Sequence, residues 1–540
     1  MAVLAVIAAV SRAEVLYATV ISGMVLCALS MPREAQGAPP ADFAQRVEKA
    51  RTAIGVPGMA VAIAESDRVT LAQGFGVRAL GRSERVDADT IFPTGSTGKA
   101  FTVADLAILV DEGKIGWDDR VIDRLPGFQM YDAWVTREMT IRDLLVHRSG
   151  LGLGEGDLLF VPRTSLTRVE SVRRLRYLKP ATSFRSGFAY DNVLYMVAGQ
   201  LIEAVTGETW EKYTAERVLR PSGMLHSTSD EEARFANPDR AQPHARMDGG
   251  MRGVGSQEML DERDELGRNG APAGGLAVSA SDMARWLRIQ LAGGALPDGA
   301  GRLFSAAAHE QMWALVTLQP IPEMPAPLKQ TQPMFESYAL GWEVQDYGGT
   351  RIVWHGGAVF GFKAAVVLIP EKRIGFAIEI NSEDGEIIRG LMFELLDHYL
   401  GRPHIDWVAR FSAEKQRQIA EALAALKAPA AKPAPVGPSL PLNGYAGTFS
   451  DPWYGNLEIA AMNNKLTIDF RSTPRMTGTL EHWQYDTFIT QFDDKTIEPA
   501  YVTFNLDADG KIERIVLKAA SPLADFSYDY QDLLFKPVRK

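Results

Sequence analysis

Hydrophobic positions switch between helical and strand-like spacing several times along this chain. Residues 42–53 carry them at helical spacing, and two apolar, β-branched stretches at 59–65 and 68–76 flank a polar Ser66-Asp67 pair. This pattern predicts a short amphipathic helix followed by a β-hairpin. From residue 94 to about 224 the spacing is mostly helical. Further strands are expected at 341–346, 351–355, 362–369 and 374–381, and helices at 387–400 and 407–427.

Residues 229–270 show little periodicity. This segment is rich in Gly, Asp and Arg and is too long for an ordinary connection, which is typical of a lid or a binding loop. We expect specificity to depend on it and on residues 153–179. Within the latter, the arginine-rich piece 168–176 has Val172 and Leu175 at helical spacing, which indicates an ordinary amphipathic helix.

A proline-rich stretch at 428–441 separates the end of the chain from the rest. It holds five prolines among alanines, a composition typical of a semi-rigid spacer. Beyond it, apolar and polar residues alternate in short runs at 457–459, 465–469, 501–505 and 511–516, as in half-buried antiparallel strands. The sequence therefore predicts an α+β domain over residues 38–427 and an all-β domain over residues 442–540.

The composition excludes several classes of protein. Apolar residues make up 46% of the 540 residues and charged residues 23%, as in an average globular protein. The net charge of −10 gives no global basic footprint for nucleic acid. The single cysteine, Cys27, can form no internal disulfide, and the eight histidines contain no H-E-x-x-H pair. We therefore expect neither a metal ion nor a cofactor.

The first 37 residues have the features of an export signal. An apolar run from Val15 to Met31 follows Arg12, and Ala35-Gln36-Gly37 supplies small residues for cleavage. The run is shorter than the ~20 residues that span a bilayer comfortably, so a cleaved signal peptide is favoured over a membrane anchor. This predicts a periplasmic or secreted protein with no stable membrane span.

The strongest candidate for chemistry is Ser96-Thr-Gly-Lys99, at the entry to a predicted helix. The apolar stripe of that helix, extended backwards, passes through Lys99 and then Ser96. Burial of a lysine lowers its pKa, and a lysine close to neutrality beside a serine is a competent proton acceptor. The motif alone is weak, because Ser412-Ala-Glu-Lys415 also matches it on a charged helix.

Downstream motifs strengthen this interpretation. Tyr190-Asp-Asn192 and then His355-Gly-Gly357 follow in order, the latter on a predicted strand. In this order the chain resembles the serine β-lactamase-like superfamily. The branch it resembles holds class C β-lactamases, D-alanyl-D-alanine carboxypeptidases, D-aminopeptidases and family VIII esterases. Supporting segments are 144–151, 221–224, 273–283 and 340–342, and within the first of them His147 is interpreted as structural.

The resemblance implies a fold and a set of roles. The body would be an antiparallel sheet flanked by helices with an all-helical subdomain, followed by a barrel-like accessory domain. Ser96 would be the acylated nucleophile, Lys99 its proton partner, and Tyr190 the general base and proton shuttle. Asn192 would hold Lys99 or the substrate amide. Gly357 would let the strand approach the substrate, and the backbone N–H of Ser96 and Ala358 would form the oxyanion hole.

His355 departs from the pattern of β-lactamases, which mostly have lysine there. A histidine is largely neutral near pH 7 and binds a substrate carboxylate poorly. We therefore expect a peptidase or amidase acting on small or D-residue-containing peptides. Size and layout also resemble peptidases of linearised microcystin. The alternatives are an esterase for short acyl esters, a β-lactamase, and a non-catalytic penicillin- or peptidoglycan-binding protein, and the oligomeric state is left open.

Overall fold

An eight-stranded antiparallel sheet forms the centre of the first domain. The computed structural model describes residues 38–264, 266–427 and 436–538, so the predicted signal peptide and much of the linker lie outside the described residues. The strand order is β2-β1-β12-β11-β10-β9-β8-β7. The strands are β1 (Gly58–Glu65), β2 (Arg68–Gly76), β7 (Thr317–Leu318), β8 (Glu336–Tyr338), β9 (Glu343–Tyr347), β10 (Thr350–Val359), β11 (Phe362–Ile369) and β12 (Ile374–Ile380).

The predicted hairpin and the four later strands are confirmed, with one extension. Strands β1 and β2 pair from Gly58 opposite Gly76 to Glu65 opposite Arg68. Strand β10 continues past the predicted end at His355 to Val359, and it pairs with β11 over this whole extension. Its partner β9 ends earlier, at the pair between Trp354 and Glu343. One edge of β10 therefore lies beyond the end of β9 from residue 355 onward.

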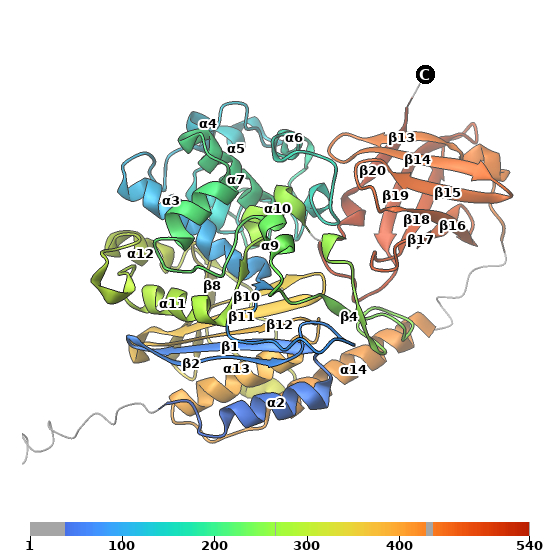
Figure 1. Cartoon of the computed structure of the whole chain (residues 1–540). Coiled ribbons are helices and arrows are strands. Elements are labelled where there is room, and N and C mark those ends of the chain that lie inside the picture. Colours follow the sequence, from blue (N-terminus) through green and yellow to red (C-terminus); the bar gives the residue numbers. More distant parts are fainter. Residues whose placement is uncertain (1–37, 265, 428–435, 539–540) are drawn as a thin grey trace, which may run out of the picture. The chain divides into compact units, whose positions relative to one another are not determined.

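Three helices cover one face of the sheet: α2 (Phe43–Ile54), α13 (Gly385–Tyr399) and α14 (Trp407–Lys427) (Figure 1). Alternate strand residues such as Ile63, Phe376 and Ile378 face them and form a buried cluster with Leu391 and Leu395. The period of two in the strands and of 3.6 in the helices places these apolar side chains on facing surfaces.

The opposite face of the sheet carries α11 (Ala280–Leu291) and a helical region (Figure 1). The α-helices of that region are α3 (Lys99–Asp111), α4 (Val121–Arg124), α5 (Ala133–Glu138), α6 (Arg168–Arg174), α7 (Val193–Thr206), α8 (Trp210–Thr214), α9 (Glu231–Ala236), α10 (Gly267–Gly274) and α12 (Ala306–Met312). The expectation of a single apolar stripe on α3 is wrong, because every residue from Lys99 to Leu109 is buried. Helix α3 lies inside the helical region, packed on several sides.

Residues 229–270 contain more structure than their lack of periodicity suggested. They include α9, the start of α10 and a two-stranded sheet of β4 (His244–Arg246) and β5 (Gln257–Met259). These elements are too short for a periodic signal to develop. A further two-stranded sheet pairs β3 (Phe92–Pro93) with β6 (Ala277–Val278), directly before the predicted nucleophile.

The second domain is a closed eight-stranded antiparallel barrel. Its strands are β13 (Gly447–Asp451), β14 (Gly455–Met462), β15 (Lys465–Phe470), β16 (Thr477–Gln484), β17 (Thr487–Phe492), β18 (Ala500–Leu506), β19 (Ile512–Ala519) and β20 (Leu534–Pro537). Burial alternates as predicted, so that in β15 the side chains of Leu466, Ile468 and Phe470 point inward. Pairing of β13 with β20 closes the barrel and leaves no free sheet edge.

The two domains belong to one compact unit, Pro40–Lys540. The hydroxyl of Thr164 and the backbone N–H of Ser165 donate to the carbonyl of Ser472 at 2.8 and 2.9 Å. Arg174, on the predicted amphipathic helix α6, donates to the carbonyls of Trp453 and Tyr454. Arg174 therefore connects the two domains.

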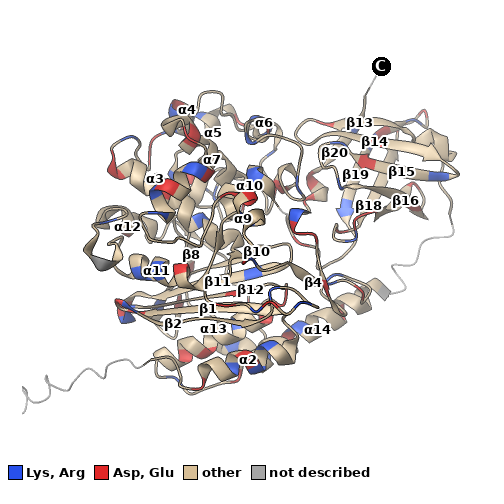
Figure 2. Ribbon diagram, viewed as in Figure 1, with Lys and Arg blue, Asp and Glu red and all other residues tan. Residues whose placement is uncertain are grey.

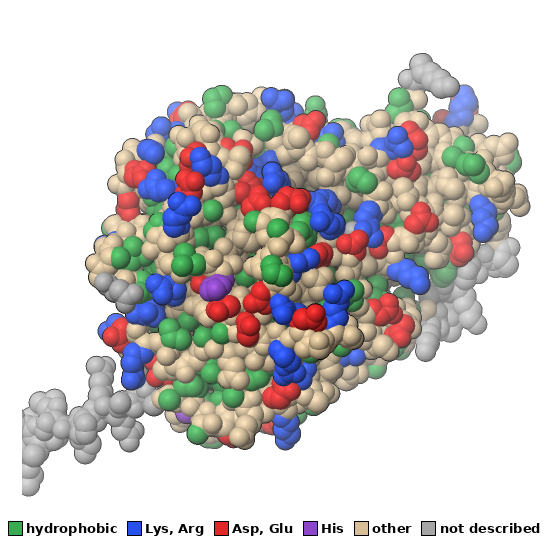
Figure 3. Space-filling view, viewed as in Figure 1, with side chains coloured by type: hydrophobic (Ala, Val, Ile, Leu, Met, Phe, Trp, Pro, Cys, Tyr) green, Lys and Arg blue, Asp and Glu red, His purple; other side chains and the backbone are tan. Residues whose placement is uncertain are grey.

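Charged side chains of both signs are spread over the helices and strands (Figure 2). On the face drawn in Figure 3, basic and acidic groups are interspersed. Among the described residues many charged groups form ion pairs, such as Arg240 with Glu262 at 2.7 Å and Arg246 with Asp384 at 2.9 Å. The face drawn in Figure 3 therefore shows no large patch of a single charge sign.

Candidate active site

Ser96 lies in a tight 3-10 turn, Gly95–Gly98, directly before α3. Gly95 has φ +54°, a conformation that favours glycine. A Cβ on Gly95 would stand 2.5 Å from the backbone nitrogen of Ala358, so no side chain fits there. The turn thus presents Ser96 at the start of a helix, against strand β10.

Lys99 is the first residue of α3, and its side chain is completely buried. Its Nζ lies 3.0 Å from the Ser96 hydroxyl, 2.6 Å from Oδ1 of Asn192 and 2.9 Å from the carbonyl oxygen of Ala273. Burial lowers the pKa of Lys99 from 10.5 to about 7, although Asp157 and Asp191 act in the opposite direction. A substantial fraction of Lys99 is therefore neutral at neutral pH.

The three contacts of Lys99 also orient its lone pair. The neighbouring atoms of Asn192 and Ala273 are carbonyl oxygens, which can only accept hydrogen bonds. A neutral amine has two N–H groups, and these two acceptors occupy both of them. The remaining lone pair then faces the Ser96 hydroxyl, the one neighbour of the three that can donate.

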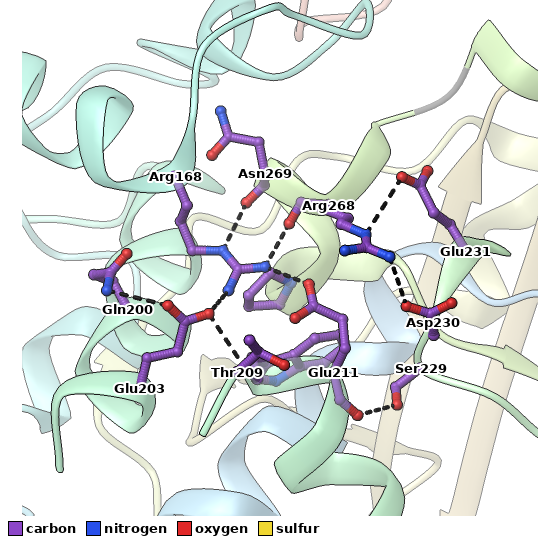
Figure 4. A network of polar contacts seen from close by, with 12 residues as sticks. Arg168, Gln200, Glu203, Thr209, Glu211, Ser229, Asp230, Glu231, Arg268 and Asn269 are labelled. Carbon is purple, nitrogen blue, oxygen red and sulfur yellow. Dashed lines mark hydrogen bonds and ion pairs between the residues drawn. The ribbon is translucent and has the colours of Figure 1, made fainter. Parts of the chain in front are cut away.

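The first turn of α10, the helix that also carries Ala273, takes part in a polar network (Figure 4). Arg168, almost buried, donates to the carboxylates of Glu203 and Glu211 and to the carbonyls of Arg268 and Asn269. These contacts join α6, α7 and α8 to the first turn of α10. Arg168 is therefore a structural anchor, a role that the interpretation of residues 168–176 as an ordinary amphipathic helix did not include.

Tyr190 lies in the segment that leads into α7. Its ring packs on the ring of His147 at 4.0 Å between centroids, and Nζ of Lys99 stands 4.9 Å from its ring centroid. The hydroxyl of Tyr190 is buried and makes no hydrogen bond within the described part of the chain. Burial raises the pKa of Tyr190 well above 10, while the nearby Ser96 hydroxyl acts in the opposite direction. Tyr190 is therefore a protonated phenol at neutral pH.

Asn192 connects Lys99 to a buried carboxyl group. Its Oδ1 accepts from Lys99, and its Nδ2 donates to Oδ2 of Asp157 at 2.8 Å. Burial raises the pKa of Asp157 to about 7. Of the two roles that the resemblance offered for Asn192, the structure shows the contact with Lys99.

His355 is buried on β10 and has partners at both ring nitrogens. Nδ1 lies 2.6 Å from the carbonyl of Gly356, and Nε2 lies 2.7 Å from the hydroxyl of Tyr338. Because the carbonyl can only accept, Nδ1 carries the proton and Tyr338 donates to Nε2. Burial lowers the pKa of His355 to about 3, so the ring is neutral. In this arrangement His355 offers no charge to a substrate carboxylate.

Gly357 and Ala358 bring β10 against the Ser96 turn. A Cβ on Gly357 would lie 1.9 Å from the carbonyl oxygen of Thr94 and 3.2 Å from the backbone nitrogen of Ser96. Only glycine permits this approach. The backbone N–H groups of Ser96 and Ala358 thus belong to two segments in direct contact, as an oxyanion hole requires.

All the predicted site residues except Lys99 line one pocket of about 820 Å³; Lys99 lies behind Ser96. Four further residues lie close to Lys99 or Tyr190 in the site and were not predicted there from the sequence: His147, Asp157, Asp191 and Tyr338. His147 was interpreted as structural, and the structure shows its ring against Tyr190, with its pKa lowered well below 6.5 by burial. Only its position in the 144–151 motif could have indicated this.

Among the described residues, no three His, Cys, Asp or Glu side chains gather so as to hold a metal ion. A search of the same residues for a helix long and apolar enough to cross a membrane finds none.

Comparisons with known proteins give the family. A family model described as Beta-lactamase matches residues 43–398, and a domain of unknown function, DUF3471, matches residues 431–537. An unguisins hydrolase of Aspergillus campestris is 31% identical over 442 residues, 77% of each chain. Penicillin-binding protein 4 of Amycolatopsis lactamdurans is 30% identical over 371 residues, 67% of this chain and 89% of the relative.

Solved structures share the fold. The octameric penicillin-binding protein homologue from Pyrococcus abyssi superposes with a TM-score of 0.57 at 21% identity, over 88% of this chain and 98% of that one. A D-amino acid amidase from Ochrobactrum anthropi gives a TM-score of 0.53 at 20% identity, over 67% and 98%. The chain therefore belongs to the β-lactamase family of serine hydrolases. The predicted fold, resemblance and enzyme class are confirmed.

Proposed function

We propose that this protein hydrolyses amide bonds in small or D-residue-containing peptides through an acyl-enzyme on Ser96. The observation that carries the proposal is the 3.0 Å contact between the Ser96 hydroxyl and Nζ of the buried Lys99. The sequence likeness to the unguisins hydrolase supports a hydrolytic activity. Linearised microcystin is the narrowest substrate that we propose to test.

In the first step, Oγ of Ser96 attacks the carbonyl carbon while its proton passes to Nζ of Lys99. The oxyanion of the tetrahedral intermediate accepts hydrogen bonds from the N–H of Ser96 and of Ala358. The hydroxyl of Tyr190 donates a proton to the leaving nitrogen and regains one from Lys99, so the amine departs and an ester remains on Ser96. Water then attacks the ester, releasing the acid and restoring the Ser96 hydroxyl.

The opposite pKa shifts of Lys99 and Tyr190 suit these two groups to different steps of proton transfer. The pKa of Lys99 is lowered to about 7, whereas that of Tyr190 is raised well above 10, in both cases by burial. A general base works best with a pKa near the working pH. We therefore assign the base in acylation to Lys99 and not to Tyr190, for which the resemblance suggested that role. Tyr190 keeps the role of proton shuttle.

The environment of His355 favours peptides over β-lactams. In β-lactamases the corresponding lysine supplies a cation, but His355 is neutral and both its nitrogens have partners. A carboxylate of the substrate would therefore form no ion pair with His355.

A direct test combines labelling with turnover. A fluorescent phosphonate should label the wild type and not Ser96→Ala, while Ser412→Ala, at the second Ser-x-x-Lys match, serves as the matched control and should label like the wild type. D-residue peptide amides, p-nitrophenyl esters and a chromogenic cephalosporin are then compared as substrates. Turnover of esters alone would contradict the peptidase proposal, and equal labelling of Ser96→Ala would contradict the nucleophile.

We also propose that the protein is exported, on the strength of the apolar run 15–31 and the small residues at 35–37. Expression in a bacterial host followed by N-terminal sequencing tests this. A mature protein starting near residue 38 in the periplasm or medium supports export, and an intact N-terminus in the cytoplasm contradicts it.

A further inference from the structure

The segment between β19 and β20 of the barrel reaches the active-site pocket. Residues 523 and 525–528 of this segment line the same pocket as Ser96 and Tyr190. The ring of Phe526 stands 5.9 Å from the ring of Tyr190, at 71° to it. The backbone of Gly154 accommodates it, because a Cβ there would lie 2.6 Å from the Phe526 carbonyl oxygen and 2.7 Å from its ring.

Two apolar side chains of this segment remain exposed although they lie in the pocket. Phe526 is 40% exposed and Leu523 is 43% exposed. Next to them, Tyr528 is buried and stacks on Phe360 at 6.3 Å and 11°. Exposed apolar surface inside a substrate pocket gains free energy when an apolar group of the ligand covers it.

The same segment is fixed to the first domain by buried hydrogen bonds. The carboxyl oxygens of Asp529 accept from the backbone N–H of Gly156 at 2.6 Å and of Leu158 at 3.2 Å. Ser527 Oγ donates to Oδ2 of Asp157 at 2.8 Å. The segment is thus bonded to the short turn around Asp157 in two ways: through the backbone N–H groups of that turn and through the carboxyl group of Asp157.

The contact of Ser527 leads directly to the proposed base. Oδ2 of Asp157 accepts from Ser527 and also from Nδ2 of Asn192, whose Oδ1 accepts from Lys99. Three hydrogen bonds therefore join a barrel serine to the Nζ of Lys99. The other carboxyl oxygen of Asp157, Oδ1, is buried and has no partner among the described residues. Loss of Ser527 would leave Asp157 with a single hydrogen bond.

We infer that the barrel completes the active site: residues 521–529 form a subsite for an apolar side chain of the substrate, and Ser527 positions Lys99 through Asp157 and Asn192. The inference rests on the proposed function. It predicts that the enzyme prefers peptides with a bulky apolar residue near the scissile bond. It also predicts that changes in the barrel alter the protonation of a lysine in the other domain.

The sign of the Ser527 effect follows from the charges around Asp157, which are Lys99, Asp525 and Asp529. The Ser527 hydroxyl favours the charged carboxylate and so lowers the pKa of Asp157. The charge of Asp525 raises the pKa of Asp157, and Asp157 in turn raises the pKa of Asp529. Without Ser527, Asp157 carries less negative charge, so the ammonium form of Lys99 loses stabilisation. The acidic limb of the acylation rate should then move to lower pH.

The experiment uses the full-length chain with Phe526→Ala and Ser527→Ala. Controls are Met462→Ala, a 61% exposed apolar side chain of the barrel outside the pocket, and Ser472→Ala, whose Oγ bonds within the barrel to the Tyr454 carbonyl. For Phe526→Ala, we expect the ratio of kcat/KM for phenylalanyl over glycyl peptide amides to fall roughly ten- to 100-fold, mainly through KM. For Ser527→Ala, we expect a downward shift of the acidic limb in phosphonate labelling.

Two results would overturn the inference: an unchanged selectivity ratio in Phe526→Ala, or a pH profile of Ser527→Ala that matches Ser472→Ala. Thermal unfolding of each variant shows that the barrel is intact. The proposed function fails separately, because Ser96→Ala with wild-type turnover would contradict it whatever the barrel variants do. Inactive Ser96→Ala together with unaltered Phe526→Ala and Ser527→Ala contradicts only the role of the barrel.

Discussion

Replacing Asn192 by aspartate tests whether the low pKa of Lys99 controls acylation. The change from 10.5 to about 7 corresponds to about 5 kcal/mol between the two protonation states. Asn192 Oδ1 lies 2.6 Å from Nζ, and an aspartate of the same shape would place a carboxylate there. It would share a proton with the adjoining Asp157, so the pair would carry one full negative charge, partly on the oxygen beside Nζ, whereas Asp157 alone, with a pKa of about 7, carries only part of a charge at pH 7.

An opposite charge at this distance raises the pKa of a lysine by roughly one to three pH units. For a rise of two pH units, the neutral fraction of Lys99 at pH 7 falls roughly 50-fold. The second-order rate of phosphonate labelling should fall by the same factor at pH 7 and approach that of the wild type near pH 10. The assay measures this rate from pH 5 to 10 for the variant, the wild type and Asn237→Asp.

Asn237→Asp is the control because it adds the same charge in the loop after α9, where the side-chain oxygen caps the N–H of Asp239 and a carboxylate can do the same. Its profile should match that of the wild type, with an acidic limb centred near pH 7. A wild-type profile without this limb would refute the reasoning. So would an Asn192→Asp rate that is reduced by one constant factor at every pH, because that outcome indicates displaced geometry and no change in protonation.

Three further predictions concern other parts of the molecule. Tyr190→Phe should lower turnover of peptide amides roughly 100- to 10,000-fold, yet melt no lower than the wild type, because the lost hydroxyl is buried without a partner among the described residues; near-normal turnover would contradict its role as proton shuttle. Gly357→Ala should abolish labelling of Ser96, since its Cβ would stand 1.9 Å from the Thr94 carbonyl oxygen and push β10 away, whereas Gly349→Ala, at an open turn of the same sheet, should still be labelled; equal labelling of both would be inconsistent with the close approach. Asp105→Asn should stabilise the protein increasingly from pH 4.5 to pH 8: burial raises the pKa of Asp105 well above 3.8, so the folded state binds more protons than the unfolded state and the wild type loses stability as the pH rises. Urea unfolding at both pH values measures this difference, and an equal difference at the two would contradict it.

The sheet and the barrel could be predicted because their residues follow simple periods. Strands β11 and β15 alternate or run apolar over lengths that match their bounds closely, and α14 occupies the range expected from helical spacing. Local spacing failed where burial comes from several sides, as in α3, whose polar residues Thr102 and Asp105 are buried as completely as its leucines. Their partners, the Pro272 carbonyl and Thr214, come from distant segments.

The site shows the same division. Ser96, Lys99, Tyr190 and His355 stand in motifs whose order is visible in the sequence, but the roles of Asp157 and Ser527 depend on contacts between residues 370 positions apart. No periodicity or spacing encodes such a pair. The proton roles of Lys99 and Tyr190 likewise required the burial of both groups, which lowers one pKa and raises the other.

The placement of residues 521–529 between the last two strands of a closed barrel bears on how such enzymes diversify. The apolar side chains of Phe526 and Leu523 are exposed, while the barrel interior is filled by residues such as Phe449, Phe470 and Phe504. Substitutions at the tip of this segment therefore leave the interior of the barrel untouched. With the subsite proposed here, natural variation, or laboratory recombination of barrels between relatives, would exchange substrate preference while the proposed nucleophile Ser96 and Lys99 are inherited unchanged.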